Sequence, residues 1–194
     1  HAPSRQVYAT LLYLNDAGRS FFAFRLHQFI SGAWNVYATL EPKDTRYITL
    51  DGQQFKPGER GKPLFNVAFC RECGQEYYPV WAEMEGKSPN RFTPRELTER
   101  LSEDDSLLFG YLISDEDGLF DAEDIENHYP EEWLEYRDGF ARLKPYYRKY
   151  CPRSFSIGAD GRITGDGVLF WFIPETFRFC LRCGVSYDGG SRSD

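Results

Sequence analysis

A chain of 194 residues is long enough for one domain with an inserted or appended subdomain. With 41% hydrophobic and 17% aromatic residues it can bury a substantial core, which excludes a wholly disordered chain. The net charge of −7 argues against general affinity for nucleic acid, and the longest apolar run, Val168 to Ile173, is far shorter than the roughly 20 residues that span a bilayer.

The first residues of the chain and the spacing of its cysteines indicate the cellular compartment in which the protein resides. His1-Ala2-Pro3-Ser4 has no apolar stretch, so we expect no signal peptide and no membrane partner, and we expect a soluble piece of a larger protein. Four of the five cysteines form two Cys-x-x-Cys pairs, which is unlike a secreted disulfide framework. This spacing favours metal binding in a reducing compartment, and we expect the cytoplasm.

The sequence pattern predicts β structure for residues 5 to about 69. Aromatic and β-branched residues gather in short runs, and turn residues such as Asn15-Asp16-Ala17-Gly18 and Asp51-Gly52 separate them. The last run leads directly into the first cysteine pair. The expected strands are residues 7–13, 21–29, 36–40, 47–50 and 64–69.

Residues 86–150 are expected to be a helical insertion. Thr93-Pro94-Arg95-Glu96 matches a capping box with proline at the first helical position, and Leu97 and Leu101 follow at i, i+4. A second helix is expected from Pro130 to about Leu143. It would carry Trp133, Tyr136 and Phe140 on one face and end at Lys144-Pro145.

Charge is divided sharply within this insertion. From Glu103 to Glu135 there are thirteen acidic residues and no Lys or Arg, whereas from Arg137 to Arg153 there are six basic residues against the single Asp138. We interpret the acidic segment as a solvated face, because it matches neither an ATPase motif nor an EF-hand loop.

The basic segment is a candidate contact for single-stranded nucleic acid. It alternates cations, which bind phosphates, with tyrosines, on which bases stack. The alternative is a helix end with solvated charges and aromatic residues packed on the core, and the acidic segment would neutralise it equally well. The candidate contact residues are Arg142, Lys144, Tyr147, Arg148, Lys149 and Arg153.

Residues 153 to 179 return to β structure. Ala159-Asp160-Gly161-Arg162 predicts a hairpin turn, and Val168 to Ile173 predicts a buried strand that leads into the second cysteine pair. The expected fold class is α+β, with a β-rich scaffold closed by a four-cysteine, zinc-ribbon-like site and a helical insertion. The segments are 1–85 with the first Cys-x-x-Cys, 86–150 as the insertion, and 151–194 with the second.

The cysteine motif is repeated. Residues 69–77 and 179–187 share the pattern F-C-x-x-C-G-x-x-Y. Two residues between thiolates let both sulfurs turn toward one ion at about 2.3 Å, and the glycine leaves room for backbone amides to donate to the sulfurs. We therefore predict that one structural zinc ion joins the two pairs across the 106 residues 74–179. Its ligands would be Cys70, Cys73, Cys180 and Cys183.

Other interpretations of the cysteines remain open. Four thiolates also suit iron, because rubredoxin has similar C-x-x-C-G motifs, although it is far shorter. A redox dithiol or disulfide fits the duplicated pattern poorly. Cys151 has no partner in the pattern and is expected to be a free thiol, and His27 is expected to be a structural histidine.

Several of these motifs resemble the cysteine-bearing module of large bacterial DEAD/DEAH-box helicases of superfamily 2, related to the Lhr-like group. They are Arg25-x-His27-x-Phe29, Trp34-Asn35-Val36-Tyr37-Ala38, Phe69-Cys70-x-x-Cys73-Gly74 and the ending from Phe170 to Tyr187. The resemblance covers residues 20–80 and 165–190, and it implies a zinc module between or beside two motor lobes. Those lobes, in the same parent chain, would be its partners.

The motor itself is not in this sequence. The chain has neither a nucleotide-binding loop nor an Asp-Glu-x-Asp/His box, so we expect it to be non-catalytic, with ATP binding and helicase activity in the parent. We expect an accessory domain that gives rigidity and guides DNA or RNA. The alternative is a protein-interaction or structural zinc domain without nucleic-acid contact.

Overall fold

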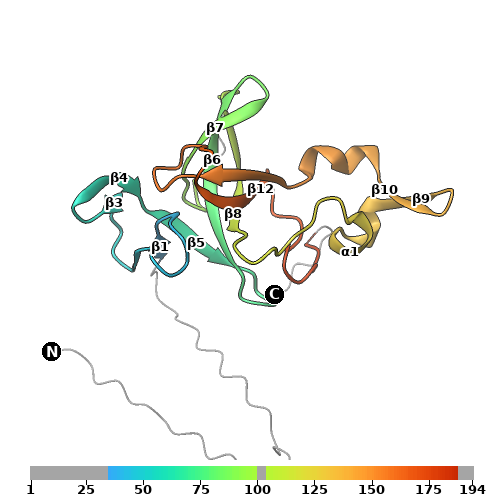
Figure 1. The fold of residues 1–194 in the computed structure, drawn as a ribbon, viewed down its shortest axis with the longest axis horizontal. Coiled ribbons are helices and arrows are strands. Elements are labelled where there is room, and N and C mark those ends of the chain that lie inside the picture. Colours follow the sequence, from blue (N-terminus) through green and yellow to red (C-terminus); the bar gives the residue numbers. More distant parts are fainter. Residues whose placement is uncertain (1–34, 100–103, 188–194) are drawn as a thin grey trace, which may run out of the picture. The chain divides into compact units, whose positions relative to one another are not determined.

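The computed structural model describes residues 35–99 and 104–187. Most strands form one eight-stranded antiparallel sheet, in the order β11-β12-β8-β6-β5-β1-β2, with β7 beside β6 (Figure 1). Two short ribbons, β3–β4 and β9–β10, lie outside it. The sheet strands are β1 Val36–Ala38, β2 Ile48–Thr49, β5 Phe65–Phe69, β6 Glu76–Glu85, β7 Ser88–Pro94, β8 Leu107–Ser114, β11 Arg153–Ile157 and β12 Val168–Pro174.

β6 is the strand around which this sheet is built. Its start pairs with β5, its middle with β8 on one edge, and its second half with β7 on the other edge. The residues from Tyr77 to Ala82 are all buried, as a strand covered on both faces requires. Because neighbouring side chains point to opposite faces, Tyr77 and Tyr78 enter different hydrophobic cores.

The first core lies between the strands of the eight-stranded sheet, with residues from β5, β6, β7, β8, β11 and β12. Its rings include Phe92 of β7 and Phe172 of β12, whose centroids are 5.1 Å apart. Arg162 forms a β-bridge to β7, and Ile163 forms one to the last residue of β11. These bridges bring the β11 edge back to β7, so the strands surround the core.

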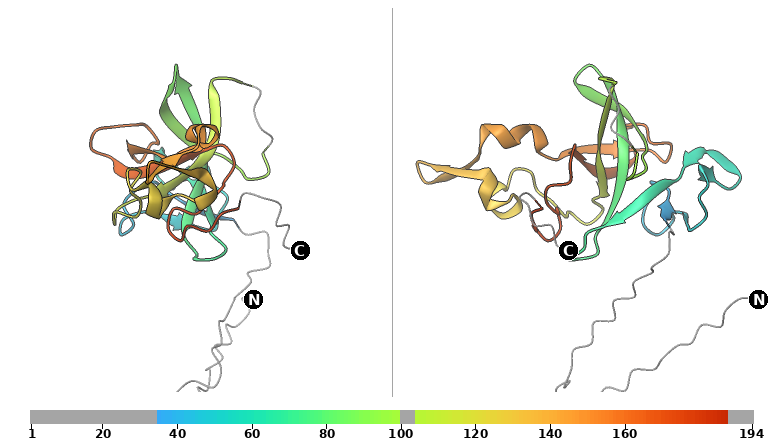
Figure 2. Two further views of the ribbon diagram at one scale, coloured as in Figure 1. Left: turned by 90° about the vertical axis from the view of Figure 1, so that its right-hand side faces the viewer. Right: turned by 180° about the vertical axis from the view of Figure 1, so that it is seen from behind.

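The second core lies against the cysteine pairs and is mainly aromatic. It is covered by the segment between β8 and β11, which contains α1 (Ile125–His128), the 3₁₀ helices Glu131–Trp133 and Pro145–Tyr150, and the β9 (Leu134–Arg137) and β10 (Phe140–Leu143) hairpin. Figures 1 and 2 show this hairpin extending away from the eight-stranded sheet. The members of the core include Cys70, Tyr77, Phe120, Tyr129, Trp133, Tyr150, Phe179 and Cys180.

The fold class expected from the sequence is confirmed, because a β-rich scaffold with a small helical element surrounds a cluster of four cysteines. The strands predicted at 36–40, 47–50, 64–69 and 168–173 correspond to β1, β2, β5 and β12. The turn predicted at 159–162 is present. The strands predicted at 7–13 and 21–29, with His27, lie outside the described residues.

The helix predicted from the Thr93 capping box is wrong. Thr93 and Pro94 end β7, where they pair with Trp81 and Val80. The carboxylate that would complete the box, that of Glu96, instead accepts a hydrogen bond from Asn66 Nδ2 at 2.8 Å, and the backbone N–H of Glu96 donates to Glu99 at 3.3 Å. The pairing with β6 holds Thr93 extended, so the capping box does not form and no helix starts there.

The helix predicted from Pro130 to Leu143 is also wrong. This segment is a 3₁₀ turn followed by β9 and β10. Asp138 and Gly139 both have positive φ, 54° and 82°, which matches a type I′ hairpin turn. The Asp-Gly pair was the stronger signal, and the helical spacing of Trp133, Tyr136 and Phe140 was coincidental.

None of the helices in the described part of the chain is long and apolar enough to cross a membrane. The remaining ribbon consists of β3 (Phe55–Lys56) and β4 (Glu59–Pro63), and its ion pairs join Lys56 and Lys62 to Glu41 and Glu59. This ribbon lies at the opposite end of the sheet from the β9–β10 hairpin (Figures 1 and 2).

Gly161→Ala is expected to destabilise the first core. Gly161 has φ of 83°, and an added Cβ would lie 2.1 Å from the carbonyl oxygen of Phe92. We expect a loss of about 1–3 kcal/mol in the free energy of unfolding, measured by urea denaturation. Gly165→Ala is the control, because nothing lies within 4 Å of its added Cβ. Equal effects of the two substitutions would contradict this packing.

Candidate metal centre

The two cysteine pairs sit in loops with the same backbone geometry. The first loop joins β5 to β6, and the second follows β12. In each loop the first cysteine donates its N–H to the carbonyl five residues later, at 2.8 Å for Cys70 and 2.9 Å for Cys180. The glycine N–H returns to that cysteine's carbonyl, and Gly74 and Gly184 have φ of 75° and 70°. A residue with a Cβ is strained in this left-handed region, which explains the repeated glycine.

The four cysteine sulfurs form one compact group. They all lie within 4.8 Å of one another, although the pairs are separated by residues 74–179. Cys70 Sγ lies 3.8 Å from Cys183 Sγ, and Cys73 Sγ lies 3.7 Å from Cys180 Sγ. Four sulfurs placed tetrahedrally at about 2.3 Å from one ion are roughly 3.8 Å apart.

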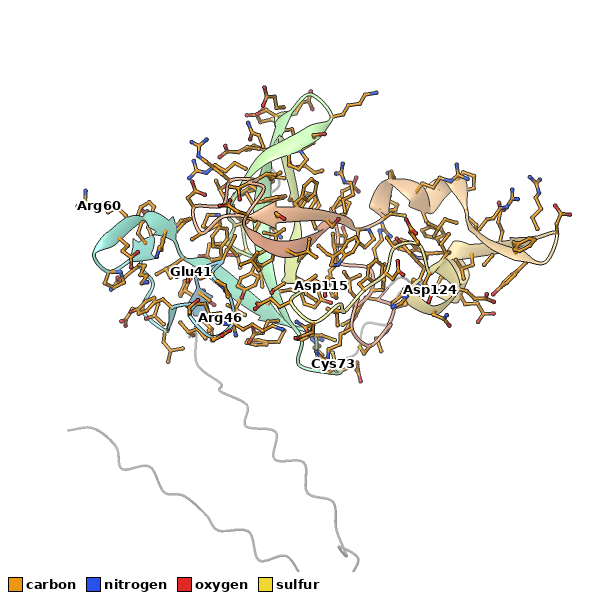
Figure 3. All side chains as sticks on the ribbon, in the orientation of Figure 1. Glu41, Arg46, Arg60, Cys73, Asp115 and Asp124 are labelled. Atoms are coloured by element: carbon orange, nitrogen blue, oxygen red, sulfur yellow. The ribbon has the colours of Figure 1, made fainter. Side chains whose placement is uncertain are left out.

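The cluster therefore has the dimensions of a four-thiolate metal site. A disulfide would need sulfurs about 2 Å apart, and all four cysteines are free. Cys70 and Cys180 are buried, whereas Cys73 and Cys183 are exposed, so the site is closed by protein on one side. Figure 3 labels Cys73 in the loop that follows β5.

The tyrosine that ends each repeat contacts the sulfur of the other repeat. Tyr77 Oη donates a hydrogen bond to Cys180 Sγ at 3.2 Å, and Tyr187 Oη lies 3.3 Å from Cys70 Sγ. Tyr77 Oη also accepts the backbone N–H of Leu181 at 3.0 Å. Each motif thus supplies two thiols and one crossed hydrogen bond. The repeated Tyr in F-C-x-x-C-G-x-x-Y was visible in the sequence, but its role was missed.

The thiols differ strongly in acidity. Burial acts to raise the pKa of Cys70, but hydrogen bonds from Tyr187 and from the backbone outweigh it and lower that pKa to about 6. For Cys183, burial and the neighbouring thiols raise the pKa to about 12. Closely spaced thiolates repel one another, so a cation in the cluster would favour ionisation of all four and would release protons on binding.

The second loop also holds the aromatic core. Phe179 directly precedes Cys180 and makes an edge-to-face contact with Trp133 at 5.0 Å. Ser186 Oγ donates to Glu132 at 2.6 Å. The base of the β9–β10 hairpin is therefore packed against the cysteine loop.

An apolar pocket of about 360 Å³ opens beside the cluster. Phe177 lines this pocket. Its ring centroid lies 4.7 Å from that of Tyr77 and 5.4 Å from that of Tyr111. Phe69 and Leu97, which also line the pocket, are exposed. The pocket offers Arg71 as its charged group.

The six candidate nucleic-acid contacts are distributed over different environments. Arg142, Arg148 and Lys149 are exposed. Lys144 donates its Nζ to the carbonyl of Glu132 at 2.7 Å. Tyr147 stacks on Trp133, with centroids 4.7 Å apart and an interplanar angle of 10°.

Two further residues of the basic segment are tied to the fold. The Arg153 guanidinium lies 6.0 Å from the ring centroid of Phe172. Tyr150 is buried beneath the Arg178 guanidinium, which lies 3.9 Å from its ring centroid. Lys144, Tyr147 and Arg153 thus already have intramolecular contacts. Of the three exposed cations, Lys149 has one as well, because its Nζ lies 4.5 Å from the ring centroid of Tyr150.

Comparisons of the chain with protein-family models, with curated proteins and with solved structures found no match.

Tyr77→Phe and Tyr187→Phe are each expected to weaken metal binding by about 10- to 100-fold, because each removes a hydrogen bond to a ligand sulfur. The affinity for Zn²⁺ can be measured by competition with a chelator. Tyr47→Phe is the matched control, since its hydroxyl has no hydrogen bond among the described residues. Unchanged affinity in both test variants would show that the crossed contacts do not support the site.

Proposed function

We propose that this chain is a zinc-stapled, non-catalytic accessory domain of a DEAD/DEAH-box helicase, which gives rigidity and guides a nucleic-acid strand. The proposal is supported by the resemblance of the cysteine motifs and by the sulfur cluster. The motor lobes of the parent would be its partners and would bind ATP. Thiolate ligands agree with a reducing compartment, and we propose the cytoplasm.

Zinc is the proposed metal. A tetrahedral set of four thiolates with no position left for water is the arrangement of structural zinc sites. Iron shares this ligand set, so the metal must be identified directly. We expect one zinc ion per purified chain and no visible absorption, measured by elemental analysis and spectroscopy. A coloured, iron-containing protein would contradict the assignment.

The nucleic-acid contact depends on one observation about charge. Among the described residues, no carboxylate forms an ion pair with any of the six basic side chains between Arg137 and Arg153. The neighbouring acidic segment therefore does not neutralise them by direct contact. Arg142, Arg148 and Lys149 are exposed as well, so their charges are available to phosphates.

The alternative is a protein-interaction domain without nucleic-acid contact. It is favoured by the exposed acidic side chains of Asp121, Glu123 and Glu131, which also form no ion pair in the described part of the chain. A basic surface of a motor lobe would suit them. Binding of a motor-lobe fragment together with indifference to nucleic acid would favour this alternative.

The double substitution Arg148→Ala/Lys149→Ala is expected to weaken binding of single strands. Loss of two phosphate contacts reduces the slope of log affinity against log salt by about 1.4. Fluorescence anisotropy with labelled oligonucleotides at several salt concentrations measures both quantities. Arg60→Ala/Lys87→Ala is the charge-matched control, because these exposed cations lie on other hairpins. Figure 3 shows Arg60 on the β3–β4 ribbon.

No binding by the unaltered chain at low salt would contradict the nucleic-acid contact. An equal loss in both double variants would instead indicate a general effect of net charge.

A further inference from the structure

On one face of the β9–β10 hairpin Leu134, Ala141 and Leu143 pack on the protein while Tyr136 is exposed, and the opposite face lies in solvent. Cross-strand partners share a face, so Leu134 and Leu143 lie on the inner side, and both contact the aromatic core. The opposite face carries the pairs Arg137↔Phe140 and Glu135↔Arg142, whose four side chains are all exposed.

Phe140 is the unusual residue of this outer face. Its side chain is 70% exposed, the largest value among the large hydrophobic residues of the described chain. The sequence had placed it on one face of a predicted helix, together with Trp133 and Tyr136. An aromatic ring kept in water on a short hairpin contributes little to the fold, because it buries little surface.

Two guanidinium groups flank this ring. Arg137 is directly opposite Phe140 across the hairpin, at a Cα separation of about 5.5 Å, and Arg142 is two residues further along the same face. Neither arginine forms an ion pair among the described residues. Glu135 lies opposite Arg142, so this face carries two cations and one anion.

The hairpin that carries Phe140 is fixed at its turn and at its base. The two-residue turn at Asp138 and Gly139 fixes the register of the two strands. At the base, Lys144 N–H donates to the carbonyl of Trp133 at 2.9 Å, and Trp133 is fully buried against Phe179 beside the cysteines. The metal centre and the hairpin are thus parts of one packed unit.

We propose that the outer face of this hairpin is a base-stacking contact for single-stranded nucleic acid, in which Phe140 stacks on a base while Arg137 and Arg142 bind the adjoining phosphates. The inference rests on the proposed function and names the residue that would hold a base. It also shifts the aromatic contact from Tyr147, which is stacked on Trp133, to Phe140.

The surroundings of Phe140 favour a nucleic-acid strand over a protein. A stable protein interface buries about 800 Å² on each partner around an apolar centre. Phe140 is the one large apolar side chain on a face that otherwise carries Glu135, Arg137 and Arg142. A single ring between cations is instead the pattern of single-strand binding, where stacking is sequence-tolerant and the phosphates supply the remaining contacts.

The test compares Phe140→Ala with Phe140→Trp in the full, zinc-loaded chain. The probes are fluorescent oligo(dT) and oligo(U) of about 15 nucleotides, within the range of known site sizes. We expect Phe140→Ala to weaken binding about 10-fold or more, and Phe140→Trp to stay within about 3-fold of the unaltered chain, because tryptophan restores stacking. Phe55→Ala, which removes an exposed ring on the β3–β4 ribbon, should leave the affinity for both oligonucleotides unchanged.

The salt dependence separates stacking from charge. Phe140→Ala should leave the slope of log affinity against log salt unchanged, whereas Arg137→Ala should reduce it by about 0.7. Metal content and unfolding midpoint should be unaltered in Phe140→Ala, because the ring is exposed.

Each other result is informative. Binding by the unaltered chain that Phe140→Ala leaves intact would overturn the stacking contact while the proposed function stands. No binding of either probe at low salt would overturn both. Light scattering that shows a dimer lost in Phe140→Ala, without any effect on strand binding, would identify the face as a self-association surface and would also overturn the inference.

Discussion

Four sulfur atoms within 4.8 Å of one another join parts of the chain that are 106 residues apart in sequence. The loop after β5 and the loop after β12 carry the same hydrogen bonds, the same left-handed glycine and tyrosines that cross to the opposite loop. Thiols at this spacing repel one another once ionised, so a bound cation would turn a destabilising cluster into a link.

The dependence on this link differs between the two cores. Strands β6, β8 and β12 form ladders of backbone hydrogen bonds around the first core, and these need no metal. The second core is made of short 3₁₀ turns, one four-residue helix and a two-stranded hairpin. Such elements are marginal alone, so their order depends on packing against Phe179 and the cysteine loops.

Much of the scaffold could be predicted from the sequence. The strands that begin at Val36, Phe65 and Val168 have strong β-forming runs bounded by turn residues. The clustering of the four cysteines followed from the repeated motif, because Cys-x-x-Cys-Gly has a local geometry of its own. Neither prediction required knowledge of long-range packing.

The middle of the chain was predicted less well, for physical reasons. Thr93 and Pro94 satisfy a helix-start pattern, but pairing with β6 outweighs that local preference. The spacing of Trp133, Tyr136 and Phe140 suits a helix, but Asp138-Gly139 favours the tight turn that their positive φ angles show, and this turn decides for a hairpin. The exposure of Phe140 and the stacking of Tyr147 on Trp133 depend on that hairpin, so they were not accessible from composition.

Hydrogen exchange with and without a chelator tests the central claim, that the metal centre orders the second core. The account predicts that chelation strongly accelerates amide exchange in residues 115–150 and 175–187, while β6, β8 and β12 keep their protection. Added zinc should restore the original rates. Equal protection of residues 115–150 in the metal-free and metal-loaded chain would contradict the account.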